Sequence, residues 1–451
     1  MTNVVILMSD QHNPRYSSVY AHPFVHTPNL ESLASQGTLF RNAYCPSPLC
    51  LPSRSAFVSG KRVHEIQTYS NCQVNLDPSH ESYGAALNRQ GVYSVHIGKT
   101  DFHTVGEKLG FTEMYPRNTA FPGDLGQRHN PMHIREGAER RANFFGPKRH
   151  LKREEDLEDI ETSIQWLKTK PKTLTKPWVL TVNIYNPHFP HYPPQNWWDF
   201  YKDKEDLPTY LVDAETAQHP FAQAQRQHFQ VQDFKEEQVR GLRRGYYGCV
   251  SFVDEQLGRL MQTLEEEGLK ETTNLIYTSD HGEMLGKFGM WWKCSLYEDS
   301  VRIPCIAAGP DFQVNHRVET PVDLHDVQAS LFEVTEVERP AEWVGIPLNK
   351  IEQNDTEHVV FAEYHGHATY SSSYMVRQNN WKYLHYINAP DQLFNLQEDP
   401  DEINNLLDNQ PEVRQKLLTL LEKICNPLEE SQRAETFIET QLTNYQTMLN
   451  N

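Results

Sequence analysis

The sequence lacks the features of a disulfide-stapled, membrane-spanning or repetitive protein. Its seven cysteines are odd in number, none of them forms a C-x-x-C pair, and a chain of 451 residues needs no disulfides to fold. It contains no apolar stretch of about 18 residues and no repeat with a period of roughly 20–50 residues. These absences argue against a disulfide framework, a zinc finger, a membrane-spanning helix and a solenoid.

Positive charge is also scarce. The 42 lysines and arginines are outnumbered by 60 aspartates and glutamates, which gives a formal net charge of −18, and no basic block interrupts the acidic sequence. A nucleic-acid backbone would be repelled, so we expect no nucleic-acid partner. A few cationic side chains focused in one cleft can still bind a small anionic substrate.

No targeting segment is visible either. A strand-like apolar run starts at residue 3, without a preceding basic region or cleavage site. From the sequence as given we expect a cytoplasmic protein without membrane partners, or a periplasmic or secreted one if a signal was removed. The oligomeric state is left open, with a homo-oligomer among the options.

The residues that are present describe a loop-rich globular enzyme. Hydrophobic residues make up 38% of the chain, aromatic residues make up 11%, and 28 prolines are spread along it. Single cores stop growing at roughly 250–300 residues, so the length predicts two domains. We place these domains at residues 1–345 and 346–451, because the pattern of elements changes in this region.

Apolar runs alternate with amphipathic segments over the first predicted domain. Strand patterns occupy residues 4–8, 93–97, 178–184 and 274–278, and helix patterns occupy residues 27–36, 154–170 and 236–267. This order predicts an α/β fold with a large, doubly wound, mixed or mostly parallel sheet between layers of helices. Polar residues follow the strands, at the edge where open sheets of this kind bind ligands.

Two later stretches break this rhythm. Residues 186–233 are rich in Pro, His, Trp and Gln without a clear period, which predicts a long functional loop region. Short alternating segments at 361–364, 373–376, 381–384 and 392–394 predict a small antiparallel sheet. A closing helix at 412–424 and a polar tail complete the expected C-terminal domain.

The sharpest motif is C-L-P-S-R at residues 50–54, followed by a helical pattern at 55–59. A C-x-P-S-R match is expected by chance in roughly one of several hundred chains of this length. The start of a helix favours anions, and Arg54 can hold an anionic group by charge-assisted hydrogen bonds. The alternative explanation is a buried cysteine before a proline-capped helix.

This motif resembles the signature of the type I sulfatases of the alkaline phosphatase superfamily. The resemblance implies that a maturation enzyme, an expected partner, oxidises Cys50 to formylglycine. The hydrate of that aldehyde offers one hydroxyl to attack sulfur and keeps a second to expel sulfate afterwards, which a serine could not do so easily. A bound divalent cation helps the hydrate to ionise.

Two polar pairs directly follow apolar strands, namely Asp10-Gln11 and Asp280-His281. A doubly wound sheet would bring both pairs to one edge, and oxygen-rich ligands suit calcium or magnesium. The resemblance implies one divalent cation, calcium ahead of magnesium, held by these four side chains and the modified Cys50. Gln11 stands where many sulfatases have another aspartate.

Two lysines stand at positions that the resemblance marks as catalytic and substrate-binding. Lys99 lies in G-K-T-D at 98–101, and Lys293 lies in W-K-C at 292–294. Both are expected to hold the sulfate oxygens and to neutralise charge as the S–O bond breaks. Many sulfatases read G-K-x-H, whereas this chain has Asp101 at the last position and His103 two residues later. The catalytic base is therefore left open between these two residues.

Two histidines complete the expected site. His188, in N-P-H at 186–188, is the expected acid that protonates the leaving oxygen and is also an expected substrate contact. The resemblance implies a further substrate contact at His219, which precedes a proline. Because the chain has 21 histidines, a lone one is more often structural.

The resemblance covers nearly the whole chain and is strongest to arylsulfatase K-type glucuronate-2-sulfatases and to choline-sulfatases. The first group shares N-A-Y at 42–44, E-Y-H-G at 363–366 and W-K-Y at 381–383, and the second shares S-D-Q at 9–11. The expected substrate is a sulfated carbohydrate, first a 2-O-sulfated uronate of the kind met in glycosaminoglycan degradation. His188, His219, His365 and Arg377 are candidate partners for its carboxylate.

Three alternatives stay open. Choline sulfate would call for an aromatic cage, which the tryptophan pairs at 197–198 and 291–292 could build. A phosphonate monoester or phosphodiester hydrolase of the same superfamily could take extra metal ligands from D-L-H-D at 323–326, which reads equally well as a helix start. A non-catalytic binding protein would be expected to lose Cys50, Arg54 or Lys99, and all three are present.

Overall fold

A mixed nine-stranded sheet forms the centre of the computed structural model, which describes residues 1–71, 77, 79–101, 109–117, 129 and 132–450. The strand order is β4-β3-β5-β1-β6-β7-β2-β8, with β9 paired to β2. The strands are β1 (Asn3–Asp10), β2 (Gly37–Tyr44), β3 (Tyr93–Lys99), β4 (Glu113–Arg117), β5 (Trp178–Pro187), β6 (Thr273–Ser279), β7 (Arg302–Ala308), β8 (His316–Val318) and β9 (Val322–Asp323). The five strands from β4 to β6 are parallel, and β7 runs antiparallel to both β6 and β2.

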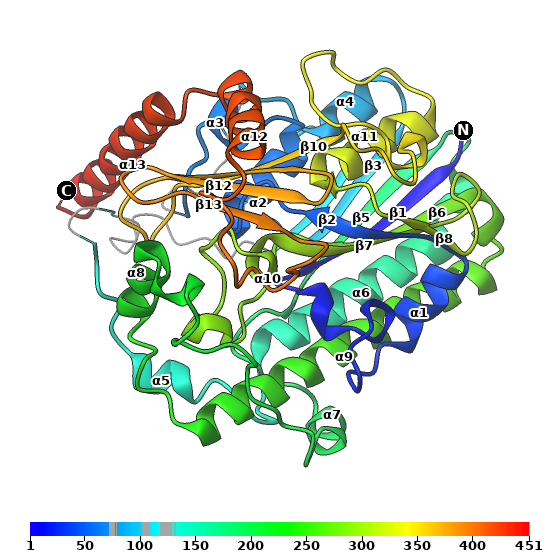
Figure 1. The fold of residues 1–451 in the computed structure, drawn as a ribbon. Helices are drawn as coiled ribbons and strands as arrows, with labels where there is room; N and C mark the ends of the chain where they lie inside the picture. Colours follow the sequence, from blue (N-terminus) through cyan, green and yellow to red (C-terminus); the bar gives the residue numbers. More distant parts are fainter. Residues whose placement is uncertain (72–76, 78, 102–108, 118–128, 130–131, 451) are drawn as a thin grey trace.

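Helices cover both faces of this sheet (Figure 1). One layer contains α1 (Pro28–Ser35), α6 (Leu151–Thr169) and α9 (Glu236–Glu266), and the other contains α2 (Cys50–Ser59), α4 (Tyr83–Arg89) and α11 (Leu324–Thr335). Along β1, Val4, Ile6 and Met8 enter one core, while Val5 and Leu7 enter the other, as the period of two requires. The continuous apolar run at the N-terminus is thus explained by burial on both faces, and the predicted fold class is confirmed.

A second sheet of four antiparallel strands lies beside the large one (Figure 1). It is a meander of β10 (Val359–Tyr364), β11 (Ser373–Gln378), β12 (Trp381–Tyr386) and β13 (Gln392–Asn395), and α12 (Pro411–Ile424) packs against it. These elements confirm the small sheet and the closing helix. The boundary near residue 345 falls between α11 and β10 and stays a prediction.

The prediction of a long loop region at 186–233 was wrong in part, because this stretch contains α7 (Gln195–Phe200) and α8 (Pro220–Phe229). The expected polar tail forms the helix α13 (Pro427–Asn450). In α13, Ala434, Ile438 and Leu442 recur every four residues and are buried. Such a stripe is enough to hold a mostly polar helix against a core.

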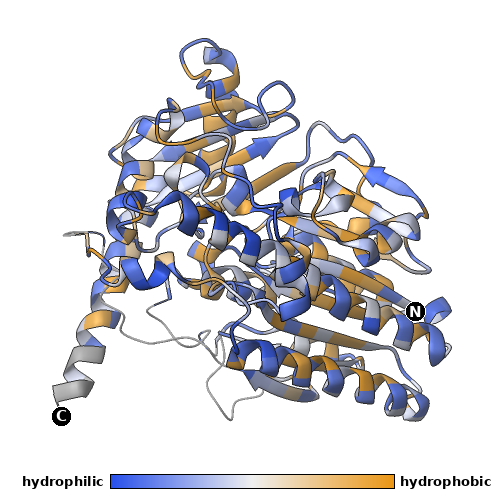
Figure 2. Ribbon diagram, turned by 90° about the horizontal axis from the view of Figure 1, so that it is seen from below, coloured by the Kyte–Doolittle hydropathy of each residue, from blue (hydrophilic) through white to orange (hydrophobic). Residues whose placement is uncertain are grey.

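The hydropathy of the ribbon follows the same layers. Figure 2 shows hydrophobic colours along the central strands and mixed colours along the helices that cover them. The large-sheet part of the chain also contains three short helices, α3 (Val63–Ile66), α5 (Ala138–Ala142) and α10 (Glu298–Val301). None of the helices in the described part of the chain is long and apolar enough to span a membrane.

Candidate active site

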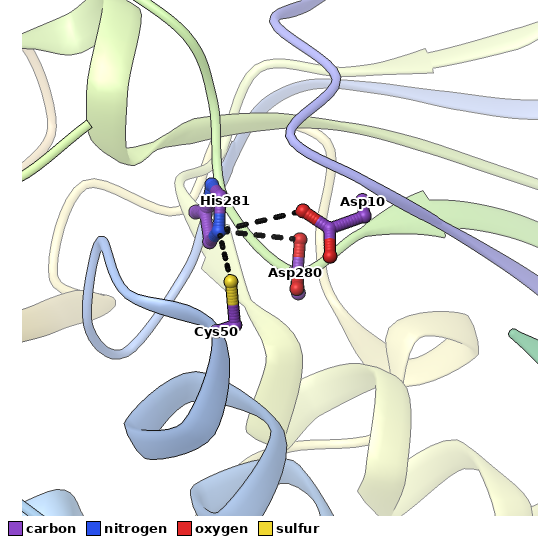
Figure 3. Close-up of side chains that lie close together, drawn as sticks. All are labelled: Asp10, Cys50, Asp280 and His281. Atoms are coloured by element: carbon purple, nitrogen blue, oxygen red, sulfur yellow. Dashed lines mark hydrogen bonds and ion pairs between the residues drawn. The ribbon is translucent and has the colours of Figure 1, made fainter. Parts of the chain in front are cut away.

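Four side chains with metal-binding groups meet at the carboxyl edge of the large sheet (Figure 3). Asp10 ends β1, Asp280 and His281 follow β6, and Cys50 opens α2. Their ligand atoms lie within 4.8 Å of one another, and all four residues are buried. Because β1 and β6 are parallel neighbours, their polar ends meet at one edge, which is the arrangement that the sequence predicted. We call these four residues the carboxyl-edge cluster.

His281 presents an unprotonated nitrogen to the cluster. Its Nδ1 lies 3.1 Å from the carbonyl oxygen of Gly282, and the ring must donate there because a carbonyl only accepts. Its Nε2 lies 3.2 Å from Cys50 Sγ, 3.6 Å from Asp10 Oδ1 and 3.7 Å from Asp280 Oδ1. Burial lowers the pKa of His281 to about 4, so the ring is neutral and can act as a ligand.

The charge of the cluster fits a divalent cation. Asp10 Oδ1 is buried and has no hydrogen-bond partner among the described residues. Burial alone would raise the pKa of Asp10, but Lys99 and the other nearby cationic groups outweigh burial and hold that pKa well below its usual range. A buried, ionised oxygen without a donor calls for a cation, and the neighbouring carboxylate and imidazole supply further ligands.

Cys50 itself is held as a neutral thiol. Burial first, and then the charge of Asp10, raises the pKa of Cys50 to about 12. A thiol must lose its proton to attack as a nucleophile or to bind a metal. The unmodified side chain is therefore poorly suited to either role in this setting.

Arg54 lies beneath the cluster, one helical turn after Cys50, and its side chain is buried. Its Nε donates to Asp280 Oδ2 at 2.8 Å, and its Nη1 donates to Asn183 Oδ1 at 3.1 Å. Its Nη2 lies 3.6 Å from Asp10 Oδ2. The guanidinium thus holds both carboxylates in place, and the spacing of four residues in α2 puts it on the same side as Cys50.

Lys99 reaches the cluster from the end of β3. Its Nζ contacts Asp10 Oδ2 and lies 3.1 Å from Asp101 Oδ2. Burial would lower the pKa of Lys99, but these two carboxylates outweigh it and raise the pKa well above its ordinary value. The residue before Lys99 must be glycine for β3 to lie this close to β5. Gly98 has a φ of +93°, and a Cβ there would lie 2.0 Å from the carbonyl oxygen of Asn183.

Lys293 lies beside Cys50. Its Nζ is 3.6 Å from Cys50 Sγ, 2.7 Å from Gln11 Oε1 and 2.7 Å from His188 Nε2. The other end of the Gln11 amide donates to Glu283 Oε2. The structure therefore brings Gln11, His188 and Lys293 to the same place as the carboxyl-edge cluster, with the Gln11 oxygen turned toward the lysine.

Of the two candidates for the catalytic base, the structure describes Asp101 and does not describe His103. Asp101 is buried, and its carboxylate contacts Lys99 within the site. His103 lies outside the described residues. The sequence left both open, and of the two only Asp101 can be placed.

Several residues expected at the substrate have other partners. His219 begins α8, where its Nδ1 accepts from Phe221 N at 3.3 Å and its Nε2 donates to the Pro390 carbonyl at 2.8 Å. His365 contacts Glu363 and Ser372, at 2.8 and 2.7 Å. Of the four candidate partners for a uronate carboxylate, His188 is the one that the structure places at the carboxyl-edge cluster.

The two tryptophan pairs have different ring partners. Trp197 packs against Phe200 and Tyr201, whereas Trp292 packs against Phe189 and Phe229. The cage for a quaternary ammonium group stays a prediction.

Two further residues lie beside the site and are not among the predicted site residues, namely Tyr185 and Glu283. The Tyr185 ring lies 5.4 Å from Lys99 Nζ, a cation–π distance, and burial raises its pKa well above the ordinary value. Glu283 accepts from Leu285 N at 2.8 Å and Trp292 N at 2.7 Å, and so shapes the loop that carries Lys293. The position of Glu283 in D-H-G-E at 280–283 was a usable signal, whereas Tyr185 looks like any strand residue.

The backbone beside the site is unusual. Gln11, Asp101, Trp292 and Cys294 all have positive φ, at 68°, 58°, 67° and 75°. Each is a site residue or a chain neighbour of one. Such left-handed conformations cost about 1–3 kcal/mol each for non-glycine residues and concentrate at functional sites.

The D-L-H-D stretch at 323–326 is a helix start. Asp323 caps α11 by accepting from His325 N and Asp326 N, and Asp326 reciprocates by accepting from Asp323 N. This capping box uses the carboxylates that a second metal would need. Among the described residues, the carboxyl-edge cluster is the group that could hold a metal.

Comparison with protein families gives two matches. The family described as "Sulfatase" matches residues 2–337. The family described as "N-sulphoglucosamine sulphohydrolase, C-terminal" matches residues 286–430, which include the four-stranded sheet.

Individual relatives agree with these matches. A choline-sulfatase of Rhizobium meliloti (strain 1021) is 30% identical over 427 residues, which cover 90% of this chain and 82% of the relative. The arylsulfatase K of Bos taurus is 27% identical over 94% of this chain and 82% of its own length.

Among solved structures, a complex with the substrate D-glucosamine-2-N,6-O-disulfate has a TM-score of 0.74 at 19% identity, with 94% of this chain and 97% of that chain covered. The phosphonate monoester hydrolase of Agrobacterium radiobacter has a TM-score of 0.75 at 20% identity, with 94% and 95% covered. These two similarities show a shared fold.

Proposed function

The chain belongs to the sulfatase family and hydrolyses sulfate esters, and from this premise we propose that it removes the 2-sulfate of a sulfated uronate with a formylglycine made from Cys50. The observation that carries the proposal is the position of Cys50. Its Sγ lies at the start of a buried helix, between His281 and Lys293, and it shares the carboxyl-edge cluster with two carboxylates.

One divalent cation is proposed between Asp10, Asp280, His281 and the modified Cys50. Gln11 would be a fifth ligand only if its amide oxygen, which accepts from Lys293 here, also reached the cation. When bound, the cation supplies positive charge that lowers the pKa of the attacking hydroxyl. Carboxylate and amide oxygens suit calcium or magnesium, and the resemblance to sulfatases puts calcium first. Elemental analysis of active protein distinguishes the two, and two tightly bound zinc ions per chain would contradict the proposal.

Cations of the chain are proposed to receive the sulfate group. Lys99 and Lys293 both lie within the site and can hold sulfate oxygens as the S–O bond breaks. Arg54 is already bonded to Asp280, so we propose that it keeps the nucleophile and metal ligands in register instead of contacting substrate. These three positive side chains lie together in the site, so the local potential there can attract an anion although the whole chain has a net charge of −18.

His188 is proposed as the acid that protonates the leaving oxygen. Its Nδ1 donates to the Phe189 carbonyl at 2.6 Å, which leaves Nε2 to accept from Lys293. Burial, followed by Lys293, holds the pKa of His188 well below its usual value, so the ring is neutral in this arrangement. A sulfate group bound between the two would offset the lysine charge and favour a protonated ring.

Asp101 is proposed as the base in place of the histidine of G-K-x-H. Its carboxylate lies in the site, 3.1 Å from Lys99 Nζ. Asp101→Asn should lower turnover by about 10²-fold or more if this carboxylate accepts a proton. An equal loss in Asp101→Asn and Asp101→Ala with no change in pH profile would instead assign the side chain to positioning Lys99.

Choline sulfate is the second candidate substrate, since the choline-sulfatase relative is 30% identical over most of both chains. The uronate is supported by the similarity to arylsulfatase K and by the resemblance of the sequence to glucuronate-2-sulfatases. Lys99 and Lys293 do not separate the two candidates, because they would hold the sulfate group of either one. Phosphonate esters are a weaker candidate, because the phosphonate hydrolase neighbour is only 20% identical and shares the fold alone.

The decisive experiment compares kcat/KM for a 2-sulfated uronate disaccharide, choline sulfate, an aryl sulfate and a phosphonate monoester. The protein should be produced together with a formylglycine-generating enzyme. We expect the uronate to be preferred. A preference for choline sulfate of more than roughly a hundredfold, about 2.7 kcal/mol, would overturn the glycan proposal while leaving sulfatase activity intact.

A further inference from the structure

A buried carboxylate on the far side of the large sheet reaches the segment that carries His188. Asp156 lies on α6 and is only 2% exposed. Its Oδ1 accepts from Tyr185 N at 2.6 Å, and its Oδ2 accepts from Asn186 N at 2.9 Å and from Asn186 Nδ2 at 2.7 Å. Three donors from two consecutive residues thus converge on one side chain.

These donors are available because the β5 ladder is irregular at its carboxyl end. The pairing of β5 with β3 ends at Asn183, opposite Gly98. Its pairing with β1 shifts register between Met8 and Asp10, and Pro187 is the next residue of β5 that pairs. Backbone amides at such a bulge need other acceptors, and Asp156 supplies them for Tyr185 and Asn186.

The anchored residues are the ones that place the proposed acid. His188 N donates to the Tyr185 carbonyl at 3.1 Å, and the two rings lie 4.8 Å apart. The Tyr185 hydroxyl donates to the Phe189 carbonyl at 2.6 Å, the same carbonyl that receives His188 Nδ1. A shift of residues 185–186 would therefore move the His188 ring away from Lys293.

We propose that Asp156 is a positioning residue, which holds His188 where it can protonate the departing oxygen. This inference rests on the proposed function, in which His188 is the acid. Asp156 touches no reacting atom, and it acts through the backbone of residues 185–188.

The chain contains a matched case without this link. Asp254 on α9 is also buried and accepts from Leu30 N at 2.8 Å, Asn29 N at 3.1 Å and Asn29 Nδ2 at 2.9 Å. Burial raises the pKa of Asp156 to about 7 and that of Asp254 to about 6. The two carboxylates thus share chemistry and burial, but Asp254 holds the start of α1, whereas Asp156 holds the segment that carries His188. Asp254→Asn is therefore a control for the loss of a buried structural carboxylate.

The test compares two sulfate esters with the matured holoenzyme, one with a nitrophenol leaving group and one with an alcohol leaving group. An alcohol needs a proton to depart, whereas nitrophenolate does not. Asp156→Asn should lower kcat by about 10²-fold for the alcohol ester and by less than about fivefold for the nitrophenyl ester, with KM nearly unchanged. His188→Ala should show the same pattern, and the double variant should be no slower than His188→Ala alone. Asp254→Asn should leave the ratio of the two esters unchanged.

Each outcome bears on the inference. Equal losses on both esters, or additive effects with His188→Ala, would overturn the positioning role and leave the proposed function standing. An inactive wild-type enzyme would overturn the proposed function and the inference with it. A His188→Ala variant without dependence on the leaving group would overturn the proposed role of His188 as the acid, and the inference would fall with it. If Asp156→Asn does not fold, Asn186→Ala removes one of the three bonds, and a preferential loss of about fivefold or more on the alcohol ester is expected. An equal effect of Asn186→Ala on both esters would contradict the inference.

Discussion

Two buried groups of charged side chains in this molecule differ in whether each carboxylate oxygen has a nearby donor or cation. The carboxyl-edge cluster leaves Asp10 Oδ1 without a hydrogen-bond partner. The second group, which we call the Glu298 network, consists of Tyr44, Glu298, Lys382 and Glu402. Lys382 is fully buried and lies 3.0 Å from Glu298 Oε1 and 2.8 Å from Glu402 Oε1.

The Glu298 network is closed in the sense that each of its carboxylate oxygens lies within 3.0 Å of an ammonium, hydroxyl or amide group. The contact of Glu402 Oε1 with Lys382 is an ion pair without hydrogen-bond geometry. Glu298 also accepts from the Tyr44 hydroxyl at 3.0 Å, and Glu402 Oε2 accepts from Glu298 N at 2.7 Å. These bonds join β2 of the large sheet and the neighbouring helix α10 to β12 of the small sheet. Similar groups therefore have different roles in our proposal: the open cluster could hold a cation and a substrate, and the closed network joins the two sheets. Changes in the first should alter activity with little effect on folding, and changes in the second should do the reverse.

The largest expected effect is on the open cluster. Cys50→Ala should lower turnover of sulfate esters by at least about 10⁴-fold, because it removes the nucleophile. The midpoint of thermal unfolding should change little, since the thiol makes few bonds in the fold. Steady-state kinetics and a thermal melt of the same preparation measure both. A folded Cys50→Ala variant with near-normal turnover would contradict the assignment of catalysis to the carboxyl-edge cluster.

Lys382→Met gives the next effect, on the closed network. It leaves Glu298 and Glu402 buried side by side without their cation, which should lower the free energy of unfolding by about 3–5 kcal/mol. Activity per folded molecule should be retained. Chemical denaturation provides the measurement. Lys350→Met is the control, because the exposed pair of Lys350 with Glu333 should contribute no more than about 1 kcal/mol.

A pair of variants within the open cluster separates metal binding from catalysis. Asp280→Asn should weaken cation binding and turnover together, because it removes a ligand and a partner of Arg54. Lys293→Ala should lower kcat by about 10²–10³-fold with the cation retained. Metal content by elemental analysis, alongside kcat, distinguishes the two. Loss of the cation from Lys293→Ala would show that the lysine belongs to the metal site.

The smallest expected effect concerns acid stability beside the Glu298 network. Burial would raise the pKa of Asp299, but Lys287 and Arg15 outweigh burial and lower it to about 2. Because the folded value lies below the ordinary 3.8, the stabilisation is complete above about pH 4 and is lost as the pH falls toward 2. Between pH 5 and 2 the wild type should therefore lose roughly 2 kcal/mol more than Asp299→Asn, as measured by urea unfolding. The exposed Asp408→Asn is the control, and equal pH slopes for all three proteins would contradict the assignment.

The sequence was informative where chemistry follows strand order. Parallel strands bring their carboxyl ends together, so Asp10 and Asp280 could be expected to meet, and the C-L-P-S-R motif indicated that Cys50 would join them. Roles that depend on packing between distant segments could not be predicted. Asp156 looks like one of many acidic residues on an amphipathic helix, and only the bulge at the end of β5 makes it an anchor. The bonds of His219 to Phe221 and Pro390, which shape the start of α8, could not be predicted either, and its role as a substrate contact stays a prediction.

The most direct test of the account is the chemical state of residue 50 in active enzyme. Trypsin should release residues 42–54 as one peptide, and this peptide also contains Cys45 as an internal reference. After thiol alkylation, mass spectrometry should find Cys45 alkylated and residue 50 present as the aldehyde, in a fraction that rises in proportion to the specific activity. Fully active enzyme with both cysteines alkylated would contradict the central claim that a formylglycine derived from Cys50 is the nucleophile.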